Sequence, residues 1–387
     1  MRVSFVGYFY LDYSAQLCKA LVEYAAVQMI IFEGMRAIVP TGWRFPDVTR
    51  VRELYRPLLG QRVDLAWINP WPWKRDPRGI ISILQAARTI RAHRPDLVHL
   101  HEQPDWRQYL LLRFLRHYPW VVTVHDPRPH MGEEASKSNW EMRLLQKIRR
   151  EASGLVVHSE TLRQQLLADD CTIIPERIHV VPMGEHGMYS TVASEALPAE
   201  EMHTLLFFGR IYPYKGLDVL LRAEPLIAER FPDVHIVVAG EAQDFGPYRS
   251  AMVHPERFEL HLGFVPREHV ASLFARASVV VLPYLEATQS AVAAIAMSAG
   301  KPVVATNVGG LSDLLTHGVT GLLTPPGDAT ALAEAICKLL GNQELRIKMG
   351  QAAKSYANNH LSWNKIAVST LDVYETAIRA RQQSRKA

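Results

Sequence analysis

Apolar runs alternate with polar loops most clearly between Val279 and Pro326. The segments are a β-branched run, a polar loop, a small-residue stretch of helical composition and a second apolar run: Val279–Leu282, Pro283–Ser290, Ala291–Ala299 and Val303–Thr306. This order of strand, loop, helix and strand predicts a βαβ unit with parallel strands. Ligands of open α/β sheets bind at the carboxyl ends of such strands, where this polar loop lies.

The same alternation extends along both halves of the chain and predicts an α/β fold. Further strands are predicted at Arg2–Phe9, Val63–Asn69, Asp96–His101, Trp120–His125, Gly154–Ser159, Ile178–Met183, Thr204–Phe208, Val234–Gly240 and Phe258–Val265. Helices are predicted at Ala15–Tyr24, Ile80–Ala92, Trp140–Glu151, Leu217–Arg230, Glu268–Ala277, Ala329–Leu340, Gln343–Asn358 and Trp363–Ala380, with Gln382–Ala387 frayed. Apolar periodicity disappears over Gly184–His203, which predicts a linker between two domains, residues 1–190 and 203–360, followed by a C-terminal helix in 361–387.

Composition agrees with a globular protein of this size. Of the 387 residues, 48% are hydrophobic and 21% charged, and the longest apolar runs fall short of the ~18 residues that a membrane-spanning helix needs. The three cysteines lie far apart and form neither a disulfide framework nor a metal-ligand spacing: Cys18, Cys171 and Cys337. We therefore expect a cytoplasmic protein.

The net charge of +4 is unevenly distributed. The whole excess of basic residues lies before residue 196, together with seven of the eight tryptophans. Basic residues among aromatic ones suit an anionic membrane surface or a phosphate-bearing acceptor, and scattered solvated charge is the alternative. The best candidate for such a patch is the helix Trp140–Glu151, which carries Arg143, Lys147, Arg149 and Arg150. A second candidate is the Trp67–Trp73 loop, which could equally be a small core, an acceptor platform or a membrane-touching loop.

Two cations mark the start of the second half. Arg210 and Lys215 lie in a glycine-flanked loop directly after the strand Thr204–Phe208. A guanidinium and an ammonium at a strand end can converge on a diphosphate. A glycine-rich G-x-G-x-x-G turn is absent after the first strand, where Gly7 stands alone, and this argues against a nicotinamide or flavin enzyme.

Two predicted neighbouring strands end in histidine, at His101 and His125. A single histidine at a strand end is usually structural, but two at the ligand edge of one sheet raise the expectation of a site. Asp126 follows His125 directly.

Several motifs resemble those of the family-4 retaining glycosyltransferases (glycosyl transferases group 1). They are Pro283-Tyr284, Glu286, Gly300-Lys301-Pro302-Val303-Val304-Ala305, Gly309-Gly310, Thr320-Gly321-Leu322-Leu323, Gly209-Arg210 with Lys215-Gly216-Leu217, and Thr123-Val124-His125-Asp126. The resemblance implies the GT-B fold, in which two Rossmann-like domains with mostly parallel sheets face each other across a cleft. It also implies a donor site mainly in the second domain, an acceptor site mainly in the first, and a last helix that returns to the first domain.

The resemblance assigns roles to individual residues. It implies His125, Arg210, Lys215 and Glu286 as catalytic residues, and Gly209, Glu241, Thr288, Gln289 and Ser290 as donor-binding residues. Tyr8, His101 and Asp126 are acceptor-side candidates. The implied reaction moves a sugar from a UDP- or GDP-linked donor to a glycan or to a polyprenyl- or lipid-linked acceptor, with retention. No Asp-x-Asp motif follows a strand, so we expect no metal and no cofactor, and we expect no nucleic-acid partner.

One departure from the family pattern concerns the nucleoside. The family typically has two glutamates eight residues apart, but here the second position is Ile295, nine residues after Glu286. Isoleucine cannot accept hydrogen bonds from a ribose, so Glu241 or backbone groups would have to replace it. The alternative function is a non-catalytic paralogue that serves as a binding subunit of a polysaccharide-assembly complex, and an epimerase or phosphorylase on the same fold is a third.

Overall fold

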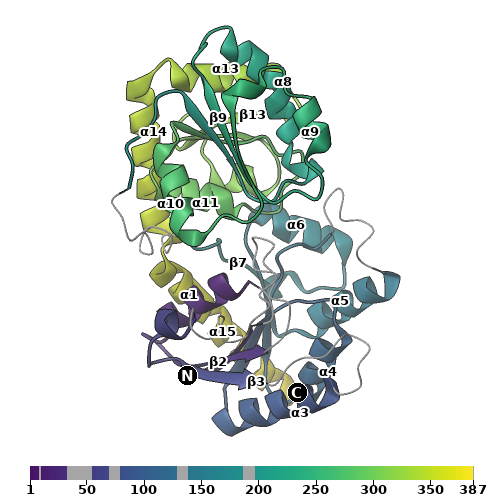
Figure 1. Ribbon diagram of the computed structural model, residues 1–387. Coiled ribbons are helices and arrows are strands. Elements are labelled where there is room, and N and C mark those ends of the chain that lie inside the picture. Colours follow the sequence, from purple (N-terminus) through teal and green to yellow (C-terminus); the bar gives the residue numbers. More distant parts are fainter. Residues whose placement is uncertain (8–9, 33–54, 69–78, 129–137, 186–196, 387) are drawn as a thin grey trace. The chain divides into compact units, whose positions relative to one another are not determined.

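The protein is described by a computed structural model that covers all residues except 8–9, 33–54, 69–78, 129–137, 186–196 and 387 (Figure 1). The described residues form two compact units. The first consists of the chain up to Pro182 together with the helix that starts at Trp363, and the second is Met183–Ser362. Each unit is a parallel β-sheet covered by helices, as the sequence predicted.

The sheet of the first unit has seven parallel strands in the order β3-β2-β1-β4-β5-β6-β7. The strands are β1 (Arg2–Gly7), β2 (Ala26–Phe32), β3 (Asp64–Ile68), β4 (Leu97–His101), β5 (Trp120–Thr123), β6 (Gly154–Val157) and β7 (Ile178–Val180). The order reverses between β1 and β4, which is where doubly wound sheets bind ligands.

Helices cover both faces of this sheet, because alternate residues of its buried strands are apolar on each side. They are α1 (Leu11–Leu21), α3 (Gly79–His93), α4 (Trp106–Phe114), α5 (Asn139–Glu151), α6 (Glu160–Asp169) and α15 (Trp363–Lys386). Val98 and Leu100 pack with Ile83 of α3 on one face. On the other face α1 packs on α15 (Figure 1). The Tyr374 hydroxyl of α15 is 2.6 Å from His99 Nδ1.

The second unit repeats the plan with six parallel strands in the order β10-β9-β8-β11-β12-β13. The strands are β8 (Thr204–Phe208), β9 (His235–Gly240), β10 (Phe258–Leu262), β11 (Val279–Leu282), β12 (Val303–Thr306) and β13 (Gly321–Thr324). Here the order reverses between β8 and β11. The loops after β8, β9 and β11 carry the predicted donor residues.

The helices of the second unit are α8 (Leu217–Ala228), α9 (Gly246–Ser250), α10 (Arg267–Arg276), α11 (Ala291–Ser298), α12 (Gly310–Leu314), α13 (Ala329–Leu340) and α14 (Gln343–Tyr356). Helix α8 packs against α13, and α11 packs against α14, on the two faces of the sheet (Figure 1). A large core of branched aliphatic residues joins α8 and α13 to β8, β9 and β11.

Two predicted helix boundaries were wrong. Helix α1 begins at Leu11 and not at Ala15, since Tyr10 with φ of 54° serves as its N-cap and Asp12 lies in the first turn, where a carboxylate complements the helix dipole. Helix α15 continues to Lys386, so the predicted fraying from Gln382 is not observed. The sequence analysis also did not predict β2, β13, α4, α6, α9 or α12.

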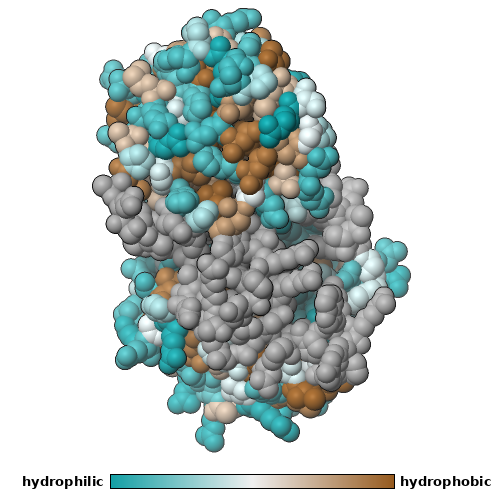
Figure 2. Space-filling view, viewed as in Figure 1, coloured by the Kyte–Doolittle hydropathy of each residue, from teal (hydrophilic) through white to brown (hydrophobic). Residues whose placement is uncertain are grey.

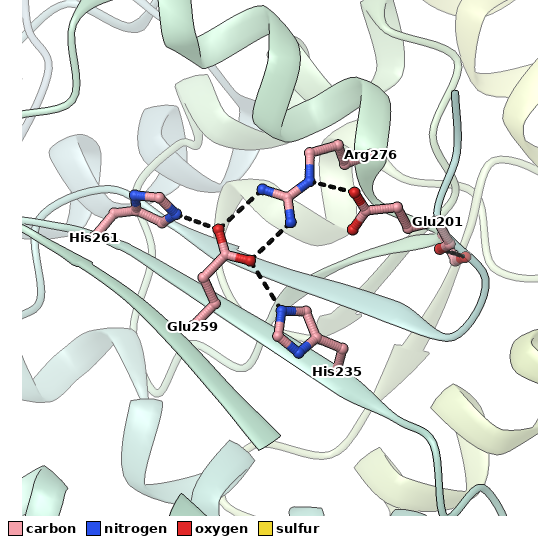
Figure 3. A network of polar contacts seen from close by, with 6 residues as sticks. Glu201, His235, Glu259, His261 and Arg276 are labelled. Atoms are coloured by element: carbon pink, nitrogen blue, oxygen red, sulfur yellow. Dashed lines mark hydrogen bonds and ion pairs between the residues drawn. The ribbon is translucent and has the colours of Figure 1, made fainter. Parts of the chain in front are cut away.

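The end of the linker is fixed to the second unit by two consecutive glutamates. Glu200 accepts from Arg346 at 3.1 Å and lies 3.2 Å from Lys301. Glu201 accepts from Arg276 Nε at 2.7 Å, and the same guanidinium makes a bidentate contact with Glu259 (Figure 3). These charge-assisted contacts join residues far apart in sequence.

Glu259 on β10 is the centre of this network (Figure 3). Its carboxylate also binds the imidazoles of His235 and His261. Hydrogen bonds from Arg276, followed by those from the two histidines, hold the pKa of Glu259 well below its usual value, against the opposing effect of burial.

Among the described residues, no helix is both long and apolar enough to cross a membrane. The face of the second unit in Figure 2 shows apolar residues interspersed among hydrophilic ones. The large exposed apolar side chains of the second unit come from separate segments of the chain, among them Met202, Val253, Leu262 and Ile347.

We predict that Glu259→Gln destabilises the second unit by about 1–3 kcal/mol at neutral pH, because it removes the charge from four hydrogen bonds while keeping the shape. Since the folded-state pKa of Glu259 is depressed, this difference should be present above about pH 4.5 and shrink as the pH falls below it. Denaturant unfolding at several pH values measures it. Glu334→Gln, at an exposed position of α13, is the control, expected within about 0.5 kcal/mol of the parent; equal losses in both variants would contradict the assignment.

Candidate active site

The loop after β8 holds Arg210 and Lys215, as predicted. The short turn Pro213–Lys215 ends at Gly216, whose φ of 67° starts α8. The Arg210 guanidinium carbon lies 5.1 Å from the centroid of the Tyr212 ring. The Lys215 ammonium donates a hydrogen bond of 2.9 Å to the Tyr284 hydroxyl and lies 4.5 Å from that ring's centroid.

Backbone contacts join this loop to the loop after β11. A Cβ on Gly216 would lie 1.9 Å from the Pro283 carbonyl oxygen, so only glycine fits there. The Leu285 amide donates to the Tyr214 carbonyl at 2.7 Å. The loop that carries the two cations therefore lies against the loop that carries Glu286.

The predicted residues of the β11–α11 loop gather at the start of α11. Ser290 caps the helix by accepting from the Ala293 amide at 3.2 Å. Thr288 is buried and Glu286 is half-buried. Among the described residues, Gln289 Oε1 is one of three buried side-chain nitrogen or oxygen atoms without a hydrogen-bond partner. A ligand hydroxyl can donate a hydrogen bond to a buried oxygen that has no other donor.

The remaining donor-side predictions concern the edge next to β9. Gly209 has φ of 105°, and a Cβ placed on it would be 3.6 Å from Lys215 Nζ, so the ammonium lies over this glycine. Glu241 follows β9 with an exposed side chain, and its carbonyl accepts from the Ile211 amide at 2.7 Å. Ile295 is 6% exposed within α11.

In the first unit, three adjacent strands end in histidines that contact one another. His125 Nε2 is 2.7 Å from His101 Nδ1, and His125 Nδ1 is 3.2 Å from His158 Nε2. Further contacts extend this row of rings at both ends. His101 Nε2 is 2.9 Å from Ser14 Oγ, and His158 Nδ1 is 2.9 Å from the Val181 carbonyl oxygen. We call His101, His125 and His158 the histidine chain.

Hydrogen-bond direction fixes the tautomers of the histidine chain. Val181 O can only accept, so His158 donates from Nδ1 and its Nε2 accepts from His125 Nδ1. His125 Nε2 then accepts from His101 Nδ1, and His101 Nε2 accepts from the Ser14 hydroxyl. This arrangement satisfies the four contacts from Ser14 to Val181 with all three rings neutral, and it directs the Ser14 hydroxyl proton to His101 although the Tyr10 carbonyl, 3.0 Å from Ser14 Oγ, can accept the same proton. The reverse direction needs an additional proton on His158.

Burial keeps these rings neutral. It lowers the pKa of His158 to about 4, while the Val181 carbonyl and the nearby Asp126 act in the opposite direction. Burial lowers the pKa values of His101 and His125 well below 6.5, and the neighbouring histidines add to the effect. Tyr10 stacks on His125 at a centroid distance of 3.8 Å, and Tyr13 packs edge-on against the same ring.

His125 is 2% exposed, and both of its ring nitrogens are engaged by other histidines. The contact of His125 with a transferred sugar stays a prediction. In this conformation both ring nitrogens already contact other histidines. His101 is likewise buried, and Asp126 is half-exposed beside the chain. Tyr8 lies outside the described residues, as do Trp71 and Trp73 of the predicted tryptophan loop.

The predicted basic face of α5 is smaller than expected. Arg149 is buried and makes a bidentate ion pair with Glu102, with Nε to Oε2 at 2.7 Å and Nη2 to Oε1 at 2.6 Å. Arg150 pairs with Asp170 at 2.7 Å. Lys147 lies over the ring of Tyr109. A buried arginine cannot serve a surface patch, so the expectation for Arg149 was wrong, and the charge of Arg150 is already matched.

The sequence analysis missed His158, Ser14 and the role of Tyr284 as a partner of Lys215. His158 carried the same signal as the other two histidines, since it follows the apolar run Gly154–Val157. Among the described residues, no group of three His, Cys, Asp or Glu side chains has the arrangement of a metal site.

We predict that acid destabilises the first unit through the histidine chain. Because the folded-state pKa of His158 is depressed, stability is full above about pH 6.5 and falls as the pH drops toward 4, by roughly 3 kcal/mol from this residue alone. Denaturant unfolding of the parent and of His158→Asn between pH 7.5 and 4.5 measures the difference. The variant should lose less stability on acidification than the parent; parallel pH profiles would contradict this role of His158.

Comparison with known proteins places the chain in a family. A family model described as Glycosyltransferase Family 4 matches residues 16–184, and one described as Glycosyl transferases group 1 matches residues 202–342. A D-inositol 3-phosphate glycosyltransferase of Kribbella flavida is 36% identical over 192 residues, which are 46% of this chain and 44% of the relative. The match therefore spans less than half the length of that relative.

Two solved structures share the fold. Sucrose-phosphate synthase from Thermosynechococcus elongatus has a TM-score of 0.71 at 20% identity, with 98% of this chain and 100% of that chain covered. Anabaena HepE in complex with UDP and glucose has a TM-score of 0.67 at 18% identity, with 97% and 99% covered. The chain thus belongs to family 4 of the glycosyltransferases, and its two parallel sheets are those of the GT-B fold.

Proposed function

We propose that this protein transfers a sugar from a nucleotide-diphosphate sugar, UDP- or GDP-linked, with retention and without a metal. One observation carries the proposal. Arg210 and Lys215 share a glycine-bounded loop at the strand reversal of the second sheet, and this loop lies against the start of α11. A relative of the same fold, Anabaena HepE, is described in complex with UDP and glucose, which supports a nucleotide sugar as the ligand.

The residues offer what sugar transfer requires. The departing diphosphate gains negative charge, and fixed positive groups stabilise it without reorganisation during the reaction. Arg210 and Lys215 supply two cations, and the first amides of α11 add a partial positive charge. Glu286 and the unpartnered Gln289 Oε1 lie in the adjoining loop, where sugar hydroxyls would bind.

The acceptor is proposed to be a glycan or a lipid-linked sugar bound by the first unit, in cell-surface polysaccharide or glycolipid synthesis. A peripheral position on the inner face of the cell membrane goes with this acceptor. Arg143 and Lys147 are the basic residues of α5 that the Glu102 and Asp170 ion pairs do not involve. Neither nucleic acid nor a metal cofactor has a part in the proposal.

The alternative is a non-catalytic binding subunit. Ile295 favours it, because this buried apolar side chain stands where the family has an acid that binds the ribose. The two readings differ in whether the second unit binds nucleoside diphosphates.

We predict that Arg210→Ala and Lys215→Ala each lower turnover at least tenfold, which corresponds to about 1.4 kcal/mol of transition-state stabilisation. Steady-state rates with the donor identified below measure the effect. Lys338→Ala, an exposed lysine on α13, is the matched control and should keep the parent rate. Parent-like rates in both site variants would remove the assigned role.

We predict that one nucleoside diphosphate raises the unfolding temperature of the protein in the absence of metal. The panel is UDP, GDP, ADP and TDP at millimolar concentration, followed by their sugar conjugates. A ligand at about 100 times its dissociation constant adds roughly 2.7 kcal/mol of stability, which a thermal scan detects. A response to one base supports the transferase, and no response across the panel supports the binding subunit.

A further inference from the structure

Tyr284 is a buried phenol that the proposed chemistry has not yet used. It follows Pro283 directly after β11 and is 1% exposed. Its hydroxyl accepts a hydrogen bond of 2.9 Å from Lys215 Nζ. The ammonium also lies 4.5 Å from the Tyr284 ring centroid and 5.8 Å from that of Tyr214, so its position is defined by two aromatic rings and one hydroxyl.

The tyrosine itself is held in place. The Thr306 hydroxyl donates to the Tyr284 carbonyl, and the Leu285 amide donates to the Tyr214 carbonyl at 2.7 Å. The preceding residue, Pro283, packs against Gly216 with no room for a Cβ. A lysine side chain normally retains several freely rotating bonds. Here Lys215 Nζ bonds to Tyr284, and backbone contacts fix the residues on both sides of that tyrosine.

The chemistry of a phenol suits this position. Burial raises the pKa of Tyr284, so the hydroxyl is neutral at physiological pH. A neutral oxygen can accept from the ammonium without cancelling its charge, whereas a carboxylate partner would neutralise it. The hydrogen bond to Tyr284 therefore does not itself neutralise the Lys215 charge.

Tyr284 also lies next to the start of α11. Ser290 lowers the pKa of the Tyr284 hydroxyl, against the larger effect of burial, and the same serine caps α11. The Lys215 ammonium and the amide end of the helix therefore both lie near one buried ring. Both carry positive charge that an anion can use.

We propose that Tyr284 is a positioning residue, which holds the Lys215 ammonium where the diphosphate of the donor binds. This inference rests on the proposed function and adds a residue to it. Tyr284 would not contact the reacting atoms, and its effect would pass through Lys215 alone.

The test compares a diphosphate with a monophosphate. Calorimetric affinities for UDP and UMP, with GDP and GMP in parallel, are measured for the full chain and for Tyr284→Phe, which keeps the ring and removes the hydroxyl. We expect the variant to bind the diphosphate at least about fivefold more weakly and to bind the monophosphate within about twofold of the parent. Equal losses for both ligands, or no loss for either, would overturn the proposal.

A double-mutant cycle shows whether the effect passes through Lys215. In the Lys215→Met background, Tyr284→Phe should change diphosphate affinity less than twofold, because the partner of the hydroxyl is gone. A full fivefold loss in that background would overturn the proposal. If the parent binds neither UDP nor GDP, the proposed function itself fails. If the parent binds one of them and Tyr284→Phe binds it equally well, only the role of Tyr284 fails.

The control is Tyr374→Phe, which removes another buried hydroxyl, the one bound to His99 in the first unit. It should leave both affinities at parent values even where it lowers the unfolding temperature. A loss of diphosphate affinity in this control would mean that general destabilisation, and not the position of Lys215, explains the effect.

Discussion

The candidate donor site depends on backbone packed directly against backbone at the carboxyl edge of the second sheet. Three pairs meet so closely that a Cβ would come within about 2 Å of a carbonyl oxygen: Gly240 against Gly209, Gly216 against Pro283, and Gly309 against Ala287. Each pair joins two loops, and real Cβ atoms do not approach carbonyl oxygens at such distances. The loops after β8, β9, β11 and β12 therefore form one rigid surface, on which Arg210, Lys215 and Ser290 keep their spacing.

The two units treat charge at their strand ends in opposite ways. In the first unit, burial keeps the histidine chain neutral, and its hydrogen bonds are satisfied internally from Ser14 to Val181. In the second unit, the ammonium of Lys215 contacts aromatic rings and a hydroxyl that is itself neutral. Neutral polar groups suit a site that orders a neutral sugar or a structural core, and cations suit a site for phosphates.

The sequence predicted what local chemistry and topology determine. The glycine-flanked loop after a predicted strand identified Arg210 and Lys215 as site candidates. The position of histidines at predicted strand ends identified His101 and His125. It could not reveal which side chains meet across the fold. The Lys215–Tyr284 bond spans 69 positions, and the Glu102–Arg149 pair spans 47, so each depends on how β-strands and helices pack. The start of helix α1 was predicted too late in the sequence because Tyr10 adopts a left-handed conformation, which is uncommon for a tyrosine.

Helix α11 shows why the nucleoside and the diphosphate should be considered separately. Its residues Val292–Met297 are all buried, and it packs on α14, where a Cβ placed on Gly350 would lie 2.1 Å from the Gly300 carbonyl oxygen. Ile295 belongs to that packed surface, so an acid at this position would require other residues to rearrange. In a nucleotide-sugar complex of this chain, ribose contacts would have to come from another element, such as the loop that exposes Glu241. Lys215 beside Tyr284, together with Arg210, would then supply a larger share of donor affinity, since charged contacts to phosphate are stronger than neutral hydrogen bonds to ribose.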